Sequence, residues 1–267
     1  MGKARAKRLA KDRRQKIVAA QRRAIEGPLP DFVVIGTQKG GTSFFYRLLT
    51  EHPLVRGAAA KELHFFDNKF AEGVGWYRRC FSEGERVDGQ RTITGEASPS
   101  YLFDPQVPER MARTVPEARL IALLRNPVDR AYSHYQMEVR RGREVRSFEV
   151  ATDEEMTSAE GEENAVDVRY AYLTRGLYAE QLERFSFFAS RDRLLVVKSE
   201  NLFTRRPQVL ESVSTFLGLP SFESTLAPPA GRPPYEPMDP ETRRRLEGYF
   251  APHNERLYNL LGADFGW

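Results

Sequence analysis

The stretch DFVVIGTQKGGTSFFYRLLTEHP, residues 31–53, decides the fold of this chain. Its wholly apolar run at 32–35 is typical of a buried parallel strand. A glycine-rich turn follows the run, and from Thr42 onward apolar residues recur at helical spacing. A strand, a tight turn and a helix in this order bring the positive end of the helix beside the turn. The stretch therefore predicts an anion-binding site.

The lysine of this turn is displaced from the position that it has in nucleoside-triphosphate loops, G-x-x-x-x-G-K-[ST]. Gly36 and Gly41 have the required separation, but Thr42 occupies the lysine position. Lys39 lies inside the turn instead. A lysine at that place suits a single phosphate whose bond to a neighbouring group is broken.

We expect backbone N–H groups, hydroxyl groups and one ammonium group to bind this phosphate: Gly40, Gly41, Thr42, Ser43 and Lys39. The glycines allow the backbone to approach the ligand closely. The hydroxyl groups lie in the first turn of the predicted helix, where they add donors to the free N–H groups of the helix.

A second cation follows another apolar run, at 119–124. This predicted strand ends in Arg125, whereas a nucleotide kinase or NTPase would carry an aspartate there to hold magnesium. Arginine is a forked donor that suits phosphate oxygens. Two separated phosphate sites without an evident magnesium carboxylate predict a ligand with a 5′ and a 3′ phosphate.

Predicted strands alternate with predicted helices along the rest of the chain. A third apolar run lies at 193–197, and helices are predicted over 128–141, 178–188, 207–217 and 239–261. This alternation favours a three-layer, P-loop-like α/β fold with a central parallel sheet flanked by helices. The acidic segment 152–163 is predicted to be an exposed loop or helix edge rather than a metal site.

The net charge of +4 conceals two parts of opposite sign. Residues 1–23 hold ten Lys and Arg against the single Asp12, which leaves 31 basic and 36 acidic residues for the rest. We therefore divide the chain into a basic N-terminal tail, 1–30, and one domain, 31–267. The tail fits either weak contact with an anionic surface or a solvated lead-in, and its thin apolar stripe favours the lead-in. No specific nucleic-acid partner is expected.

The cysteine content and hydropathy predict a cytoplasmic protein. One cysteine, Cys80, excludes an internal disulfide framework and a cysteine-built zinc site. No apolar run approaches the ~18 residues of a membrane span. The basic N-terminus also lacks the apolar core of a secretory signal.

Six motifs, in order, resemble those of sulfotransferases that use 3′-phosphoadenosine 5′-phosphosulfate (PAPS). TQKGGTS, 37–43, resembles their 5′-phosphosulfate loop, and ALLRNPVDRAYSHY, 122–135, resembles their 3′-phosphate segment with Arg125 and Ser133 at the two contact positions. KELHFFD, 61–67, resembles the acceptor motif of the heparan sulfate branch, the N-sulfotransferases and 3-O-sulfotransferases. GEASPSYLF (95–103), GLYAEQLERF (176–185) and AGRPPYEPMD (230–239) continue the resemblance.

The resemblance implies PAPS as sulfuryl donor, 3′-phosphoadenosine 5′-phosphate (PAP) as product and no metal. Lys39 would neutralise the leaving phosphate, and Glu62 would be the general base that deprotonates the acceptor. His64 is the alternative base, as in cytosolic sulfotransferases, or an acceptor contact. Lys61 and Asp67 would also bind the acceptor.

Further roles come from the same resemblance. The donor would also contact Gly231, Arg232 and Tyr178, although Tyr178 equally fits core packing. We expect burial beside Phe65 and Phe66 to raise the pKa of Glu62 and so strengthen it as a base.

Two departures from the family pattern concern the acceptor and the donor. Ala97 stands where the family's EKS or EKT stretch has a lysine, and Ala230 stands where its lysine–glycine–arginine loop begins. Arg232 is then the remaining cation of that loop. The disulfide that flanks the loop in the family is absent here, which agrees with a reducing compartment.

The sequence thus predicts a PAPS-dependent sulfotransferase that acts on a hydroxyl, less favourably an amine, of a glycan or another small sugar-containing acceptor. A P-loop nucleotide kinase or NTPase is one alternative. A non-catalytic nucleotide-binding or nucleic-acid-binding protein is the other.

Overall fold

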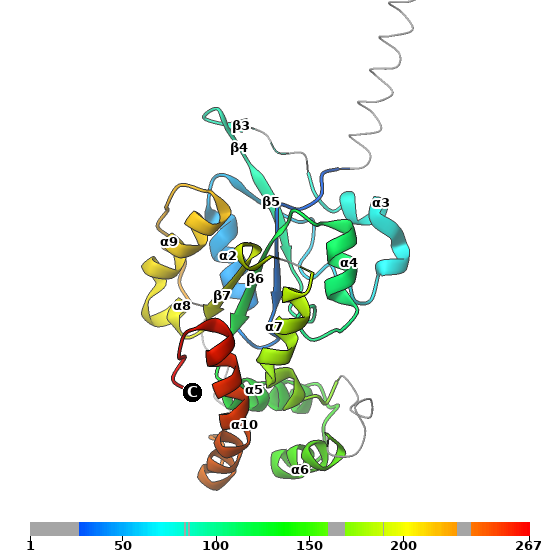
Figure 1. The fold of residues 1–267 in the computed structure, drawn as a ribbon, viewed down its shortest axis with the longest axis vertical. Helices are drawn as coiled ribbons and strands as arrows, with labels where there is room; N and C mark the ends of the chain where they lie inside the picture. Colours follow the sequence, from blue (N-terminus) through cyan, green and yellow to red (C-terminus); the bar gives the residue numbers. More distant parts are fainter. Residues whose placement is uncertain (1–26, 83, 85, 160–168, 189, 229–235) are drawn as a thin grey trace, which may run out of the picture.

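The centre of the molecule is a five-stranded sheet in which every pairing is parallel, in the order β2–β5–β1–β6–β7 (Figure 1). The computed structural model describes residues 27–82, 84, 86–159, 169–188, 190–228 and 236–267. The strands are β1 (Phe32–Gly36), β2 (Val55–Gly57), β5 (Ile93–Ala97), β6 (Arg119–Leu124) and β7 (Leu194–Lys198). A separate hairpin pairs β3 (Arg86–Val87) with β4 (Gln90–Arg91).

Helices cover both faces of the sheet, so the predicted three-layer architecture is confirmed. Phe32 and Val34 of β1 pack with α2 (Thr42–Glu51) and α9 (Arg206–Leu217), which follows the short α8 (Asn201–Thr204). Val33 and Ile35 pack on the opposite face with α3 (Gly73–Arg78), α4 (Val107–Thr114) and α7 (Tyr178–Ser186). Successive side chains of a strand point to opposite faces, which is why one apolar strand can serve two helical layers.

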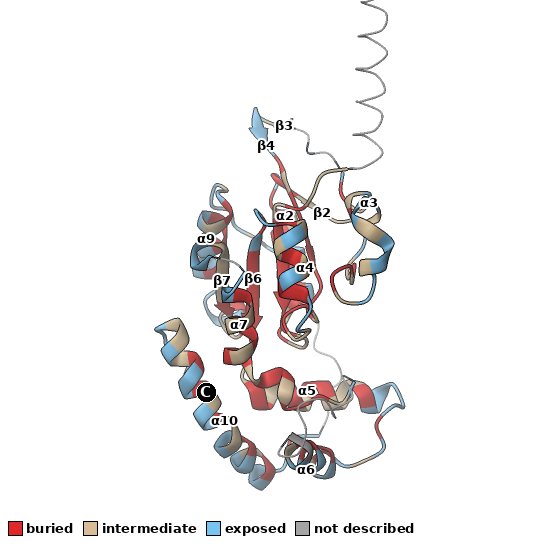
Figure 2. Ribbon diagram, turned by 45° about the vertical axis from the view of Figure 1, so that its right-hand side comes forward, coloured by how far each residue is buried: buried red, intermediate tan, exposed pale blue. Residues whose placement is uncertain are grey.

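A third apolar cluster lies below the sheet in Figure 1 and joins α5 (Pro127–Arg140), α6 (Phe148–Ala159) and α10 (Pro240–Leu261). Val128, Phe148 and Phe250 are buried in it, and Figure 2 shows buried positions in red along α5 and on parts of α10. Short 3-10 turns complete the described elements: η1 (Phe70–Glu72), η2 (Thr174–Gly176) and η3 (Arg191–Arg193).

Local signals explain where the long helices begin. Asn126 caps α5 by accepting from the N–H groups of Val128 and Asp129, and Pro127 fits the first helical position. Asp239 caps α10 in the same way, and α10 ends at Gly262, whose φ of 67° is left-handed. The four helices predicted after residue 120 are all present, with small shifts at their ends.

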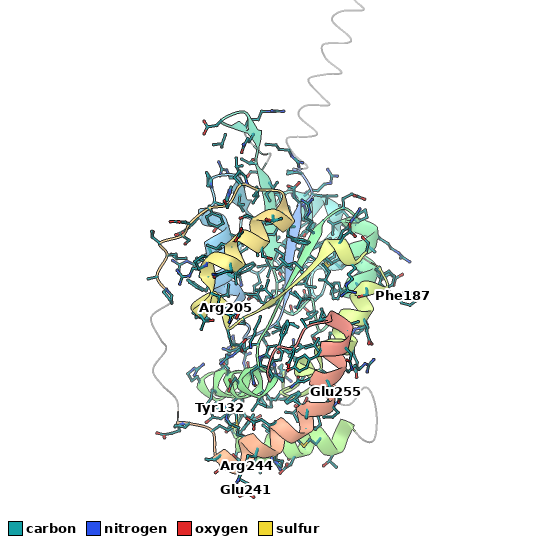
Figure 3. All side chains as sticks on the ribbon, turned by 60° about the vertical axis from the view of Figure 1, so that its left-hand side comes forward. Tyr132, Phe187, Arg205, Glu241, Arg244 and Glu255 are labelled. Carbon is teal, nitrogen blue, oxygen red and sulfur yellow. The ribbon has the colours of Figure 1, made fainter. Side chains whose placement is uncertain are left out.

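Charged side chains tie α10 to its neighbours on the outer surface, where Glu241, Arg244 and Glu255 are labelled in Figure 3. Arg243 pairs with Asp129 of α5 at 2.5 Å, Arg245 pairs with Asp153 of α6, and Arg256 pairs with Glu183 of α7 at 2.5 Å. Exposed pairs contribute about 0–1 kcal/mol each, so these contacts orient α10 more than they stabilise the fold.

Three predictions need correction or lie beyond the described residues. β2 and β5 were not predicted, because β5 reads ITGEA and lacks an apolar run although it is largely buried. The segment from 152 onward is helical up to residue 159, and Thr152 and Glu155 are buried rather than exposed. Residues 1–26 and 160–163 lie outside the described residues, so the proposed tail and domain boundary stay predictions.

Candidate active site

The predicted phosphate loop leaves the carboxyl end of β1 and is held by hydrogen bonds to the next two strands. The N–H group of Thr37 donates to the carbonyl of Leu123 at the end of β6, at 2.7 Å. The Ser199 hydroxyl, which follows β7, donates to the carbonyl of Gly40 at 2.7 Å. The loop thus lies where the strands of a parallel sheet end, the usual place for a ligand in such folds.

Two residues of the loop have left-handed backbone: Lys39 with φ of 70° and Gly41 with φ of 84°. Gly40 is required for space, because a Cβ there would lie 2.8 Å from the Leu123 carbonyl oxygen. Gly41 is the N-cap of α2, and no described side chain caps this helix. The first N–H groups of α2 are therefore left for a ligand, and the helix dipole favours an anion.

Arg125 lies against this loop. Its Nη1 donates to the carbonyl of Lys39 at 3.2 Å, and its own carbonyl accepts from the Tyr178 hydroxyl at 2.8 Å. Tyr178 is 1% exposed, and its ring packs in the core. Its hydroxyl group fixes the backbone of Arg125. Ser133 lies two turns along α5 and is also buried. Donor contacts by all three stay predictions.

Several basic side chains act on His134, a buried residue of α5. Burial, together with the charges of Arg130, Arg175 and Lys39, lowers the pKa of His134 to about 2. Arg130 is fully buried and donates to the Tyr172 carbonyl. Burial is the larger cause of the lowered His134 pKa, and the three positive charges that add to it would favour an anion nearby.

The acceptor-side residues form one chain of hydrogen bonds. Nε2 of His64 lies 3.1 Å from Oε2 of Glu62, and Nδ1 of His64 lies 2.9 Å from Oδ2 of Asp67. The Ser100 hydroxyl donates to the same Asp67 oxygen at 2.6 Å. The structure therefore brings together the two base candidates, Glu62 and His64, and the predicted acceptor contact Asp67.

Lys61 joins this chain to the phosphate loop. Its Nζ lies 3.1 Å from Oγ of Ser43 and 3.2 Å from Oε1 of Glu62. Ser43 belongs to the first turn of α2, at the predicted anion site. One lysine side chain thus spans the distance between the donor half and the acceptor half of the site.

Glu62, His64 and Asp67 all have shifted pKa values; that of Asp67 is lowered, because hydrogen bonds from His64 and Ser100 outweigh its burial. Hydrogen bonds to Asp67 and Glu62 raise the pKa of His64 to about 9. Burial alone would raise the pKa of Glu62, but hydrogen bonds from His64 and Lys61 and their charges outweigh it, so the pKa is lowered. The expectation of a raised Glu62 pKa is therefore wrong. At neutral pH Glu62 is ionised and His64 is protonated, which favours Glu62 as base; both assignments stay predictions.

The His64 shift predicts how stability depends on pH. Because the folded pKa of about 9 exceeds the ordinary value of ~6.5, the stabilisation is complete below ~6.5 and is lost as the pH rises through about 9. The melting temperature of the wild type should fall more steeply between these pH values than that of His64→Asn. Equal slopes in the two melting series would contradict the ion pairs seen here.

The family's acceptor lysine has no counterpart at position 97. Ala97 is 1% exposed and belongs to the apolar cluster that includes Val34 and α2. Ala59 and Ala60, which precede Lys61, are exposed and also carry no charge. Lys61, which adjoins Glu62 in the sequence, is the cation that contacts the candidate base.

The supporting roles of Ser98, Ser100 and Tyr101 were not predicted from the sequence, nor was the position of Glu96 in a strand. Ser98, Ser100 and Tyr101 belong to the motif at 95–103, but they follow β5, which ends at Ala97, and their partners at 64–67 are distant in sequence. Gly231 and Arg232 lie outside the described residues, so their predicted roles are untested. Within the described parts, no group of three or more His, Cys, Asp or Glu could hold a metal, and no helix is long and apolar enough to cross a membrane.

Comparisons with known proteins identify the family of the chain. Residues 29–228 match the sulfotransferase domain family. Heparan sulfate glucosamine 3-O-sulfotransferase 3B1 of Homo sapiens is 31% identical over 263 residues, covering 90% of this chain and 65% of that protein. Membrane-associated sulfotransferase kil1 of Dictyostelium discoideum is 27% identical over 314 residues, covering 90% of this chain and 66% of that protein. The chain thus spans slightly less than two thirds of the length of these two relatives.

A solved structure is also similar to this chain in sequence and fold. The crystal structure of a sulfotransferase from Alicyclobacillus acidocaldarius matches with a TM-score of 0.69 and 30% identity, covering 89% of this chain and 98% of that one. The residues that match the family, 29–228, include the phosphate loop, Glu62 and Arg125. As its motifs predict, the chain belongs to the sulfotransferase domain family.

Proposed function

We propose that this protein transfers a sulfuryl group from PAPS to a hydroxyl group of a glycan or another sugar-containing acceptor. The observation that carries the proposal is Lys61, whose ammonium group contacts both Ser43 at the anion site and the ionised Glu62. A phosphate-binding turn and a carboxylate base that share one lysine suit the transfer of a group from a phosphate to a hydroxyl.

The residues present fit such a donor. The N-terminus of α2 with Gly40, Gly41, Thr42 and Ser43 would hold the 5′-phosphate, and Arg125 with Ser133 would hold the 3′-phosphate. PAPS supplies an activated sulfuryl group bound to a phosphate. Lys39 would stabilise the charge that develops on that phosphate, and Glu62 would accept the proton of the acceptor hydroxyl.

Thermal stability with PAP, AMP and ATP–magnesium tests the donor. PAP at ~100 times its dissociation constant should add about 2.7 kcal/mol of stability, which gives a clear shift in melting temperature. A shift with PAP that exceeds the shift with AMP supports two phosphate sites. A shift with ATP–magnesium and none with PAP would contradict the proposal and favour a nucleotide kinase or NTPase.

Arg125→Ala should weaken the binding of PAP by about tenfold or more and leave AMP binding nearly unchanged. The reason is that a hydrogen bond to a charged group contributes about 1.5–3 kcal/mol, and AMP lacks the 3′-phosphate. Calorimetric titration of both ligands measures this. Arg47→Ala, an exposed arginine of α2, is the matched control. Equal losses for PAP and AMP would contradict a 3′-phosphate role.

The acceptor class rests on the relatives. Several are named as heparan sulfate glucosamine 3-O-sulfotransferases, which supports a hydroxyl of a glycan. The buried Ala97, in place of a lysine, favours an acceptor with fewer anionic groups than a highly sulfated polymer. Transfer of radioactive sulfur from PAPS to heparan sulfate, to unsulfated oligosaccharides and to a simple alkyl glycoside would separate these classes. Labelling of heparan sulfate alone would contradict the role assigned to Ala97.

Two further proposals concern the surface contacts and the cellular location of the protein. We propose weak contact between the basic segment 1–30 and anionic surfaces, supported by its charge, and a cytoplasmic location, supported by the single cysteine. Loss of vesicle binding on deletion of 1–26, with PAP binding retained, would support the first. Recovery of the tagged protein in a secretory compartment would contradict the second.

A further inference from the structure

A fully buried carboxylate lies close to the loop that carries the candidate base. Glu96 of β5 is 0% exposed and accepts three hydroxyl hydrogen bonds. Tyr77 donates to Oε1 at 2.8 Å, Tyr101 donates to the same oxygen at 3.0 Å, and Ser98 donates to Oε2 at 2.8 Å. No ion pair of Glu96 occurs among the described residues, so hydroxyl groups alone compensate its burial.

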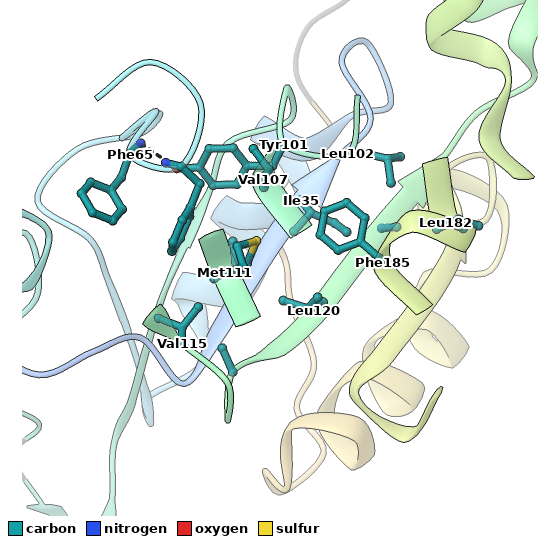
Figure 4. Packing of buried hydrophobic residues seen from close by; sticks show 14 of the residues in the cluster. Ile35, Phe65, Tyr101, Leu102, Val107, Met111, Val115, Leu120, Leu182 and Phe185 are labelled. Carbon is teal, nitrogen blue, oxygen red and sulfur yellow. Dashed lines mark hydrogen bonds between the residues drawn. The ribbon is translucent and has the colours of Figure 1, made fainter. Parts of the chain in front are cut away.

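Two of these hydroxyl groups also hold the loop that carries the base. Oγ of Ser98 accepts from the N–H group of His64 at 3.2 Å. The oxygen of Tyr101 accepts from the N–H groups of Phe65 at 2.8 Å and Phe66 at 3.3 Å, and Figure 4 shows the Phe65 contact. Three consecutive backbone N–H groups of the loop are therefore held by hydroxyl groups that are themselves fixed by one carboxylate.

The backbone at this point needs such support. His64 has φ of 55°, a left-handed conformation that a non-glycine residue adopts rarely. Strained conformations of this kind persist when the surrounding contacts over-determine them, and they cluster at functional sites. A slightly different backbone at 64 would move the imidazole away from both Glu62 and Asp67.

We propose that Glu96 is a positioning residue, which acts through Ser98 and Tyr101 to hold the backbone of residues 64–66 and thereby the geometry of Glu62, His64 and Asp67. The inference rests on the proposed function for its catalytic meaning. It assigns Glu96 no contact with the donor or the acceptor.

The cost of burying this group supports a role beyond stability. Burial raises the pKa of Glu96 to about 7, against the opposing effect of its hydroxyl hydrogen bonds. A carboxylate without a cationic partner destabilises a core relative to an apolar side chain of similar size. We therefore explain the presence of Glu96 in the central sheet by its orientation of the Ser98 and Tyr101 hydroxyl groups.

The two tyrosines offer a matched pair of variants. Both are buried and both donate to Oε1 of Glu96, but only the Tyr101 hydroxyl also accepts from backbone N–H groups of the loop. Tyr77 contacts the loop through its ring, which stacks on Phe65 at 4.3 Å and which Tyr77→Phe retains. Tyr101→Phe should lower kcat by about 100-fold, since small displacements of catalytic groups have effects of that size. The affinity for PAP should stay unchanged. Tyr77→Phe should retain the wild-type kcat, and Glu96→Gln should follow Tyr101→Phe.

The imidazole of His64 gives a readout that needs no acceptor. The chain has four histidines, so its ring resonances can be assigned with His64→Asn and followed by NMR during a pH titration. In the wild type and in Tyr77→Phe the pKa should be about 9. In Tyr101→Phe it should fall toward the ordinary ~6.5, because the two carboxylates no longer align with the ring.

The outcomes separate this inference from the proposed function. A Tyr101→Phe variant that matches Tyr77→Phe in both kcat and His64 pKa overturns the positioning role. A wild type that neither binds PAP nor transfers sulfate overturns the proposed function, while the His64 comparison still decides the role of Glu96. If Tyr101→Phe fails to fold, Ser98→Ala replaces it, with the buried Ser214→Ala of α9 as its control; equal His64 pKa values in that pair would likewise overturn the inference.

Discussion

Glu62→Gln is expected to lower the turnover of PAPS by about 10²- to 10⁴-fold, the usual contribution of a positioned general base. The amide has nearly the same shape but cannot take the proton of an acceptor hydroxyl. In the structure Glu62 is the ionised end of a chain that runs through the protonated His64 to Asp67. PAP should bind this variant almost as tightly as it binds the wild type, because the phosphate loop is unchanged.

Initial rates with a saturating acceptor, together with calorimetric titration of PAP, measure both effects. Glu72→Gln serves as the control, since Glu72 is an exposed carboxylate that follows the same loop in sequence. A Glu62→Gln variant with substantial activity would move the base to His64. That result would also require the His64 pKa to lie well below the value of about 9 found here.

Lys39→Met is expected to lower kcat by about 10²- to 10³-fold, comparable to the loss of one preorganised donor from a transition-state site. Lys39 lies inside the phosphate turn, and its carbonyl is held by Arg125 at 3.2 Å. Methionine preserves the length of the side chain and removes the charge. The affinity for PAP should fall much less than kcat, because Arg125 and the N-terminus of α2 remain.

Single-turnover rates separate this effect from product release. Lys69→Met, which removes an exposed lysine that lies over the Trp76 ring, is the matched control. If Lys39→Met reduced PAP affinity and kcat by the same factor, Lys39 would be a ground-state phosphate ligand without a special role in the transition state.

The strands and helices that have a clear apolar period could be predicted from the sequence. The buried runs of β1 and β6 and the helices α5 and α10 have such periods, and their end signals Asn126 and Asp239 lie where caps are expected. The strand β5 could not be predicted, because its buried positions include Glu96 and Gly95. Burial of a carboxylate depends on hydroxyl partners at 77, 98 and 101, and a local pattern does not reveal partners that are distant in sequence.

The same distinction applies to the site. The identity of the candidates Lys39, Glu62 and His64 followed from motifs, and the structure brings Glu62 and His64 into contact. The direction of the Glu62 pKa shift, in contrast, could not be predicted from the sequence. Burial was visible in the neighbouring phenylalanines, but the two cations that outweigh it could be placed only in three dimensions.

His64 and Lys39 have left-handed backbone conformations. A substitution at either position can therefore lower activity by disturbing the backbone as well as by removing the side-chain group. A saturation library at position 64 samples two properties at once, because β-branched side chains disfavour this conformation whereas asparagine and aspartate tolerate it. Inactive valine or isoleucine clones would report on the backbone, and the asparagine clone would report on the imidazole. Selection experiments that aim to change the acceptor should therefore leave codons 39 and 64 fixed and vary the exposed Ala59 and Ala60, which precede Lys61 in the sequence.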